Sequence, residues 1–99
     1  MKYKVIISDR AVSSLRRIVK SLKKISLIGG EDVRAALLQR IKRLSVNPTA
    51  ESRKANFEKL EGEYRSIVVL GDYRIYFKIE DGRVIVLDII MDKDGSKKI

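Results

Sequence analysis

Two turn signals in the last third of the chain separate three stretches of strand-forming residues. Asp81-Gly82 is typical of a two-residue type I′ turn, since both positions of that turn need left-handed backbone angles. Gly71-Asp72 is a second turn signal. The side chains before, between and after these turns follow the two-residue alternation of a strand, which predicts strands at 64–70, 73–80 and 83–91. Strands joined by such short turns pair antiparallel, so the chain is expected to contain a three-stranded meander.

The first half of the chain predicts a strand followed by two helices. Alternation over residues 2–8 predicts the strand, and Ser8 or Asp9 can cap a helix over 9–25. The apolar face of this helix is formed at helical spacing by Val12, Leu15, Ile18, Val19, Leu22 and Ile25.

A glycine pair is expected to separate the two helices. Ile28-Gly29-Gly30 favours a turn, so the second helix is predicted to begin near Glu31 and Asp32 and to stop before Pro48. Residues 49–56 are polar and are expected to form a loop. The predicted fold is therefore α+β, in the order β-α-α-β-β-β, with a helical hairpin on one face of an antiparallel sheet. The first strand is expected at the edge beside the strand at 64–70.

Length and composition exclude several classes of function. The 99 residues form one predicted domain, 1–99, with a polar tail at 92–99 that is expected to be flexible. Cysteine and histidine are absent, which removes thiolate chemistry, the usual general base near neutral pH and the commonest metal ligands. We expect no metal and no cofactor. No apolar run is long enough to span a bilayer, so no membrane contact is expected and the chain is interpreted as cytoplasmic.

Net charge points to a polyanionic partner. Lys and Arg number 22 against 13 Asp and Glu, which gives a net charge of +9. A charge this large on a small chain favours contact with nucleic acid, a ribosome or an acidic protein segment. The alternative is a solvated basic surface that only aids solubility.

Strand alternation assigns the side chains to two faces of the predicted sheet. Tyr73, Ile75, Phe77 and Ile79 are expected under the helices, joined by Ile85, Leu87 and Ile89. The open face is expected to carry Arg65, Arg74, Tyr76, Lys78 and Asp88, with Ile67, Val69, Val84, Val86 and Ile90 around them. Arg65 is assigned to this face because burying unpaired guanidinium groups is costly. An exposed patch of this kind usually binds a partner, but Arg74 could instead only pair with Asp88 across neighbouring strands, and Tyr76 could be only a strand former.

Two motifs give the chain a family resemblance. Tyr64-Arg65 and Tyr73-Arg74 are Tyr-Arg pairs nine residues apart, the second preceded by Gly71-Asp72, and the first approached by Lys59-Leu60-Glu61-Gly62. With the predicted element order, these motifs resemble the RelE/ParE superfamily of toxins from type II toxin–antitoxin modules. The resemblance covers nearly the whole chain and implies the fold described above.

For a RelE-type member, the resemblance implies cleavage of mRNA bound in the ribosome. Developing negative charge on the phosphate would be stabilised by preorganised cations. The resemblance then assigns catalytic roles to Arg65 and Arg74, with help from Lys93 and Tyr76. Further nucleic-acid contacts are expected from Lys78, Lys97, Lys98, Arg16, Arg17 and Lys20.

The sequence also departs from the RelE pattern. Ile67 stands at a second basic position of the first meander strand, Asp94 stands at an expected arginine beside Lys93, and the expected tyrosine would fall beyond Ile99. Two alternatives therefore stay open: a ParE-like inhibitor of DNA gyrase that acts by protein binding, and a non-toxic member that only binds its antitoxin. In each case the resemblance implies an acidic antitoxin as partner, and contact with promoter DNA only through that antitoxin.

Overall fold

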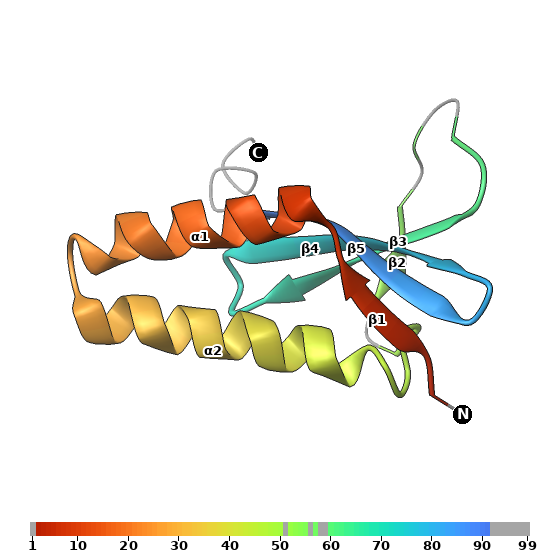
Figure 1. The fold of residues 1–99 in the computed structure, drawn as a ribbon, viewed down its shortest axis with the longest axis horizontal. Coiled ribbons are helices and arrows are strands. Elements are labelled where there is room, and N and C mark those ends of the chain that lie inside the picture. The colour runs from red at the N-terminus through yellow and green to blue at the C-terminus, as the bar shows by residue number, and fades with distance from the viewer. Residues whose placement is uncertain (1, 51, 56, 58–59, 92–99) are drawn as a thin grey trace.

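A five-stranded mixed sheet with two helices packed against it forms the structure (Figure 1). The computed structural model describes residues 2–50, 52–55, 57 and 60–91. In chain order the elements are β1 (Lys4–Ile7), α1 (Asp9–Lys23), α2 (Leu27–Arg43), β2 (Arg53–Lys54), β3 (Glu63–Val69), β4 (Tyr73–Glu80) and β5 (Arg83–Met91). The predicted tail at 92–99 lies outside the described residues, and so do Lys93, Lys97 and Lys98.

The meander predicted from the turn signals is confirmed. β3 pairs antiparallel with β4, and β4 pairs antiparallel with β5. Asp81 and Gly82 have φ angles of 50° and 74°, as a type I′ turn requires. The first turn begins one residue earlier than predicted, since Leu70 already has a positive φ of 56° and Val69 and Tyr73 are the last paired residues.

The sheet edges differ from the prediction. β1 lies beside β5, parallel to it, with Ile7 opposite Val86, and not beside β3 as predicted. The edge of β3 is instead paired with β2, a two-residue strand inside the segment predicted as a loop. Ser8 explains the placement of β1, because its amide N–H donates to the Val86 carbonyl and its hydroxyl donates to the Leu87 carbonyl. The sheet is therefore mixed rather than purely antiparallel.

The helical hairpin has the predicted form, but its second helix starts earlier. Ser8 caps α1, accepting the Ala11 amide at 3.1 Å. Ser26 caps α2 in the same way, accepting the Gly29 amide at 3.0 Å. The glycine pair therefore lies inside α2, and the predicted start near residue 31 is wrong. Gly30 is buried against α1, where an added Cβ would lie 2.5 Å from Lys23 Cγ, so the glycine permits close helix packing.

A β-bulge in β5 changes which of its side chains face the core. Tyr76 is opposite Asp88 but Phe77 is opposite Val86, so Leu87 is an extra residue. The alternation of β5 shifts at that point. The strand residues that are buried under the helices are Ile67, Val69, Tyr73, Ile75, Phe77, Val84, Val86 and Ile89. The predictions for β4 and for Ile89 are thus confirmed, whereas placing Ile67, Val69, Val84 and Val86 on the open face was wrong.

Within the described residues, no helix has the length and apolar character needed to cross a membrane.

Candidate nucleic-acid interface on the open sheet face

The face of β3 and β4 that points away from the helices carries the first candidate site. Cross-strand pairs on this face join Tyr64 to Lys78, Ser66 to Tyr76, and Val68 to Arg74. Directly opposed residues point to the same side of a sheet, and the intervening residues Ile67, Ile75 and Phe77 are buried in the core. We call these six residues, together with Phe57, the open face.

Arg74 lies where the sequence predicted it. Its Nη1 donates to the hydroxyl of Ser66 at 3.4 Å, and Ser66 is itself buried in the described structure. The guanidinium is half-buried against β3 rather than extended into solvent. This orientation preorganises a planar cation next to Tyr76, two residues further along the same strand face.

An aromatic cluster adjoins Arg74. The ring centroid of Phe57 lies 5.3 Å from the ring centroid of Tyr64 and 5.8 Å from that of Tyr76, and both pairs have edge-to-face geometry. Lys78 Nζ lies 6.0 Å from the Tyr64 ring centroid, at the limit for a cation–π contact. The sequence prediction missed Phe57 and Tyr64 as site residues, although tyrosine on an open strand face was an available signal.

Lys78 is held as a cation by a neighbouring carboxylate. Its Nζ lies 2.9 Å from Glu80 Oε1, and this hydrogen bond is the main reason that the pKa of Lys78 is raised and the pKa of Glu80 is lowered. Lys78 therefore carries its charge on the open face, as predicted, but shares it with Glu80.

Arg65 does not share the face of Arg74, so that prediction was wrong. It is opposite the core residue Phe77, and only 12% of its side chain is exposed. Its Nε donates to Ser52 Oγ at 2.6 Å and its Nη2 donates to the Ser52 carbonyl at 2.9 Å. Nη1 contacts Glu63 Oε2 at 3.3 Å. The assumption that a covered arginine would lack partners failed, because Ser52 and Glu63 supply them.

The registry of the first hairpin explains the separation of the two arginines. Arg74 is opposite Val68, which stands three residues from Arg65 on β3. Residues an odd number of positions apart on a strand point to opposite faces. The equal appearance of the two Tyr-Arg pairs in the sequence therefore hides opposite orientations.

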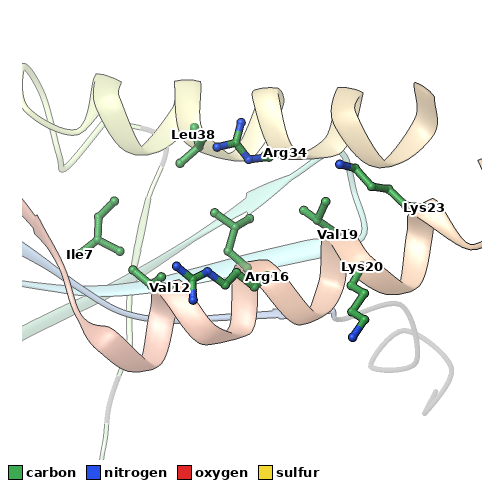
Figure 2. Close-up of a pocket in the computed structure, with 9 residues that line it drawn as sticks. Ile7, Val12, Arg16, Val19, Lys20, Lys23, Arg34 and Leu38 are labelled. Atoms are coloured by element: carbon green, nitrogen blue, oxygen red, sulfur yellow. The ribbon is translucent and has the colours of Figure 1, made fainter. Parts of the chain in front are cut away.

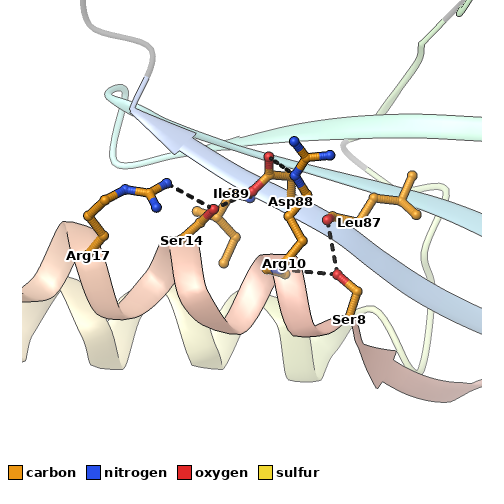
Figure 3. A network of polar contacts seen from close by, with 8 residues as sticks. Ser8, Arg10, Ser14, Arg17, Leu87, Asp88 and Ile89 are labelled. Carbon is orange, nitrogen blue, oxygen red and sulfur yellow. Dashed lines mark hydrogen bonds and ion pairs between the residues drawn. The ribbon is translucent and has the colours of Figure 1, made fainter.

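Asp88 is opposite Tyr76, on the predicted side of the sheet, but its carboxylate is engaged in a network between α1 and β5 (Figure 3). The Ser14 hydroxyl donates to Asp88 Oδ1 at 2.5 Å, and Arg10 Nε lies 3.6 Å from Oδ2. The Ile89 amide also donates to Oδ1, at 2.8 Å. These contacts replace the cross-strand ion pair with Arg74 that the sequence had suggested.

The predicted basic contacts on the first helix lie away from Arg74. Arg17 donates to the Ser14 hydroxyl at 3.3 Å and so belongs to the Asp88 network. Arg16 and Lys20 border a groove between α1 and α2 instead (Figure 2). The structure therefore brings Lys78 together with Arg74 and Tyr76, but not these three residues.

The groove between the helices is a second candidate site, which the sequence analysis did not single out. It has a volume of about 630 Å³ and an apolar floor, and Figure 2 shows cationic side chains from both helices along it. The floor residues are Ile7, Val12, Leu15, Val19 and Leu38, and the rim residues are Arg16, Lys20, Lys23 and Arg34. We call this the helix groove. An apolar floor with a positive rim suits an acidic amphipathic segment.

Among the residues that the structure describes, no group of three or more acidic, histidine or cysteine side chains is placed to hold a metal ion. The open face offers cations, hydroxyls and aromatic rings, whereas the helix groove offers cations and apolar side chains.

Three solved structures share this fold. The RelBE2 toxin–antitoxin complex from Mycobacterium tuberculosis has 21% identity and a TM-score of 0.70, covering 92% of this chain and 99% of that one. The chromosomal ParDE system from P. aeruginosa has 15% identity and a TM-score of 0.69, covering 91% and 96%. A mutant of the E. coli toxin RelE in its free state has 17% identity and a TM-score of 0.63, covering 97% and 90%.

Comparison at the sequence level identifies the family. A search of curated proteins finds no match. A family model described as the ParE toxin of the type II toxin–antitoxin system parDE matches residues 5–94, which is nearly the whole chain. The chain therefore belongs to the ParE toxin family, within the RelE/ParE superfamily, and is the toxin of a type II toxin–antitoxin system.

Proposed function

We propose that this toxin stops growth by cleaving mRNA on the ribosome, with the open face against the message. The observation that carries the proposal is the position of Arg74, which is held by Ser66 and stands beside Tyr76 and Phe57. A preorganised guanidinium stabilises charge that develops on a phosphate during RNA cleavage. Aromatic rings next to it offer a surface on which unpaired bases stack. This activity would take place in the cytoplasm, where ribosomes meet messages.

The roles of the other predicted residues follow from their positions. Tyr76, two residues from Arg74 on one strand face and so about 7 Å away, would contact the adjoining nucleotide. Lys78 would contact a further phosphate. Lys93, Lys97 and Lys98 remain proposed cations of the same site. We assign Arg65 a positioning role, because its hydrogen bonds hold the Ser52 segment against β3.

Primer extension on abundant messages after induction of the toxin tests the proposal. New 5′ ends inside reading frames that vanish when translation is blocked would support ribosome-dependent cleavage. Arg74→Gln should remove those ends, whereas Lys42→Gln, the same loss of charge at an exposed position of α2, should keep them. Intact messages in arrested cells would contradict the proposal, and intact messages in healthy cells would indicate a non-toxic member.

Inhibition of DNA gyrase is a second candidate function. It is favoured by the family model, whose description names parDE, and by the location of Arg65 on the opposite face from Arg74. A gyrase inhibitor needs a protein-binding surface and no phosphate site. Purified gyrase that supercoils DNA at its normal rate in the presence of the toxin would exclude this candidate.

The proposed antitoxin surface is the helix groove. Its positive rim complements an acidic partner, and its apolar floor would be covered by one face of an amphipathic helix. The solved relatives include toxin–antitoxin complexes, which is consistent with such a partner. The toxin would then reach promoter DNA only through its antitoxin.

A further inference from the structure

We infer that Arg40 and Arg53 join Arg74 in a second phosphate-binding pocket, at the edge of β3, which holds the backbone of single-stranded RNA. This inference rests on the proposed contact between the open face and mRNA. It adds two residues from elements that neither the sequence motifs nor the open face include.

The pocket lies beyond the end of the short strand β2. Its two residues pair only with Arg65 and Ser66 of β3, so within the described chain no strand pairs with that edge of β3 from Ile67 onward. A hollow of about 370 Å³ lies at this edge. Its lining residues come from α2, β2, β3 and β4, and they are Arg40, Arg53, Ser66, Ile67, Val68 and Arg74.

Three guanidinium groups that are distant in the sequence border this one hollow. Arg53 is opposite Ser66 and therefore points to the same side of the sheet as the open face. Arg40 comes from α2, on the other side of the sheet, and also lines the hollow beside the unpaired edge of β3. Arginine presents several N–H donors in a fixed plane, so donors from three directions suit a tetrahedral oxyanion with oxygens on every side.

The surroundings favour a nucleic-acid phosphate over a protein carboxylate. Arg74 borders both the hollow and the open face. A single-stranded RNA with one phosphate between Arg53 and Arg40 would therefore have its next base near Tyr76 and Phe57. Arg53 is opposite Ser66, and Ser66 is opposite Tyr76, so these three residues form one continuous row across β2, β3 and β4. An acidic amphipathic peptide would find more apolar surface in the helix groove, which has five apolar lining residues against two in this hollow.

Binding of a labelled single-stranded RNA of about eight nucleotides to the purified full-length toxin tests the inference. Fluorescence anisotropy is measured without ribosomes over a range of salt concentrations. Arg40→Gln and Arg53→Gln should each weaken binding about tenfold, as loss of a charged hydrogen bond predicts. Each should also reduce the slope of log affinity against log salt by about 0.7. Lys42→Gln should change affinity by less than about twofold, since its side chain is exposed and outside both candidate sites.

The outcomes separate this inference from the proposed function. Affinities of both arginine variants equal to that of Lys42→Gln would overturn the inference even if messages are cleaved in cells. Weakened RNA binding would support it even if primer extension finds intact messages, which would overturn the proposed function instead. Unchanged RNA binding with weakened binding of an acidic antitoxin peptide would assign the pocket to that peptide and overturn the inference. Thermal unfolding of each variant confirms that it is folded, and Arg53, exposed on a two-residue strand, is the position least able to disturb the fold.

Discussion

The open face and the helix groove both carry basic side chains, but they present them on different surfaces. The open face offers Arg74, Lys78 and aromatic rings on strands, where the alternation of side chains spaces them at about 7 Å. The helix groove offers a continuous apolar floor between two helices, with cations only at its rim. We propose that the first surface suits a phosphate backbone and the second an acidic protein segment. Charge alone, without the shape of the surface beneath it, does not identify the partner.

The largest expected effect is loss of toxicity from Arg74→Gln with antitoxin binding retained. Removal of one preorganised hydrogen-bond donor lowers the reaction rate roughly 100-fold or more when that donor stabilises negative charge in the transition state. Growth after induction and primer extension measure the loss, and titration with antitoxin measures the retained binding. Full toxicity of this variant would show that the open face is not the site of action.

A charge reversal in the helix groove should have the converse effect. Lys20→Glu combined with Arg34→Glu places two negative charges at the rim, so the affinity for an acidic antitoxin should fall roughly 100-fold while toxicity is kept. Cells that make antitoxin would then no longer be protected. Calorimetric titration of antitoxin into the purified variant measures the change. Unaltered affinity would mean that the antitoxin occupies another surface.

Arg65→Ala should mainly affect stability and so sharpen the contrast with Arg74. The side chain is mostly covered and bonds to Ser52 and Glu63, so its loss should lower the free energy of unfolding by about 1–3 kcal/mol. Urea denaturation measures this value. A variant that unfolds like the wild type but is no longer toxic would restore a direct role for Arg65 in the activity.

The smallest expected effect is a change in stability with pH from the Lys78–Glu80 pair. The pKa of Glu80 is lowered by Lys78, so the contribution of the pair is present above the ordinary Glu pKa and is lost as the pH falls through the lowered value. The pKa of Lys78 is raised, so the same contribution is lost at the alkaline end as the pH rises through that value. Glu80→Gln should therefore destabilise the protein slightly near neutral pH, and the difference in stability from the wild type should shrink as the pH falls. A difference in stability that grows with falling pH would contradict this assignment.

Local patterns predicted the meander and both helices because the signals for these elements lie within a few residues. Strands β4 and β5 have the predicted bounds, and Ser8 caps α1 as expected. Gly29 and Gly30 misled the prediction because glycine serves equally to end a helix and to let two helices approach closely. Only the packing of Gly30 against α1 distinguishes these uses.

The candidate site was predicted in part for the same reason. Arg74, Tyr76 and Lys78 share a face because they alternate along one strand, which is a local property. Arg65 was misplaced because its orientation depends on the register of the hairpin formed by β3 and β4, and Val84 and Val86 were misplaced because of the β-bulge at Leu87. Neither feature leaves a signal in the residues immediately around it.

The sequence by itself determined the order of the elements apart from β2, the meander, the basic character and the family. Only the tertiary structure decided that β1 joins β5, that Arg65 and Arg74 lie on opposite faces, and that Arg40 and Arg53 meet Arg74 at one sheet edge. The physical reason is that backbone propensities and side-chain periodicity act over a few residues, whereas strand partners, register and the meeting of distant side chains are set by the packing of the whole core.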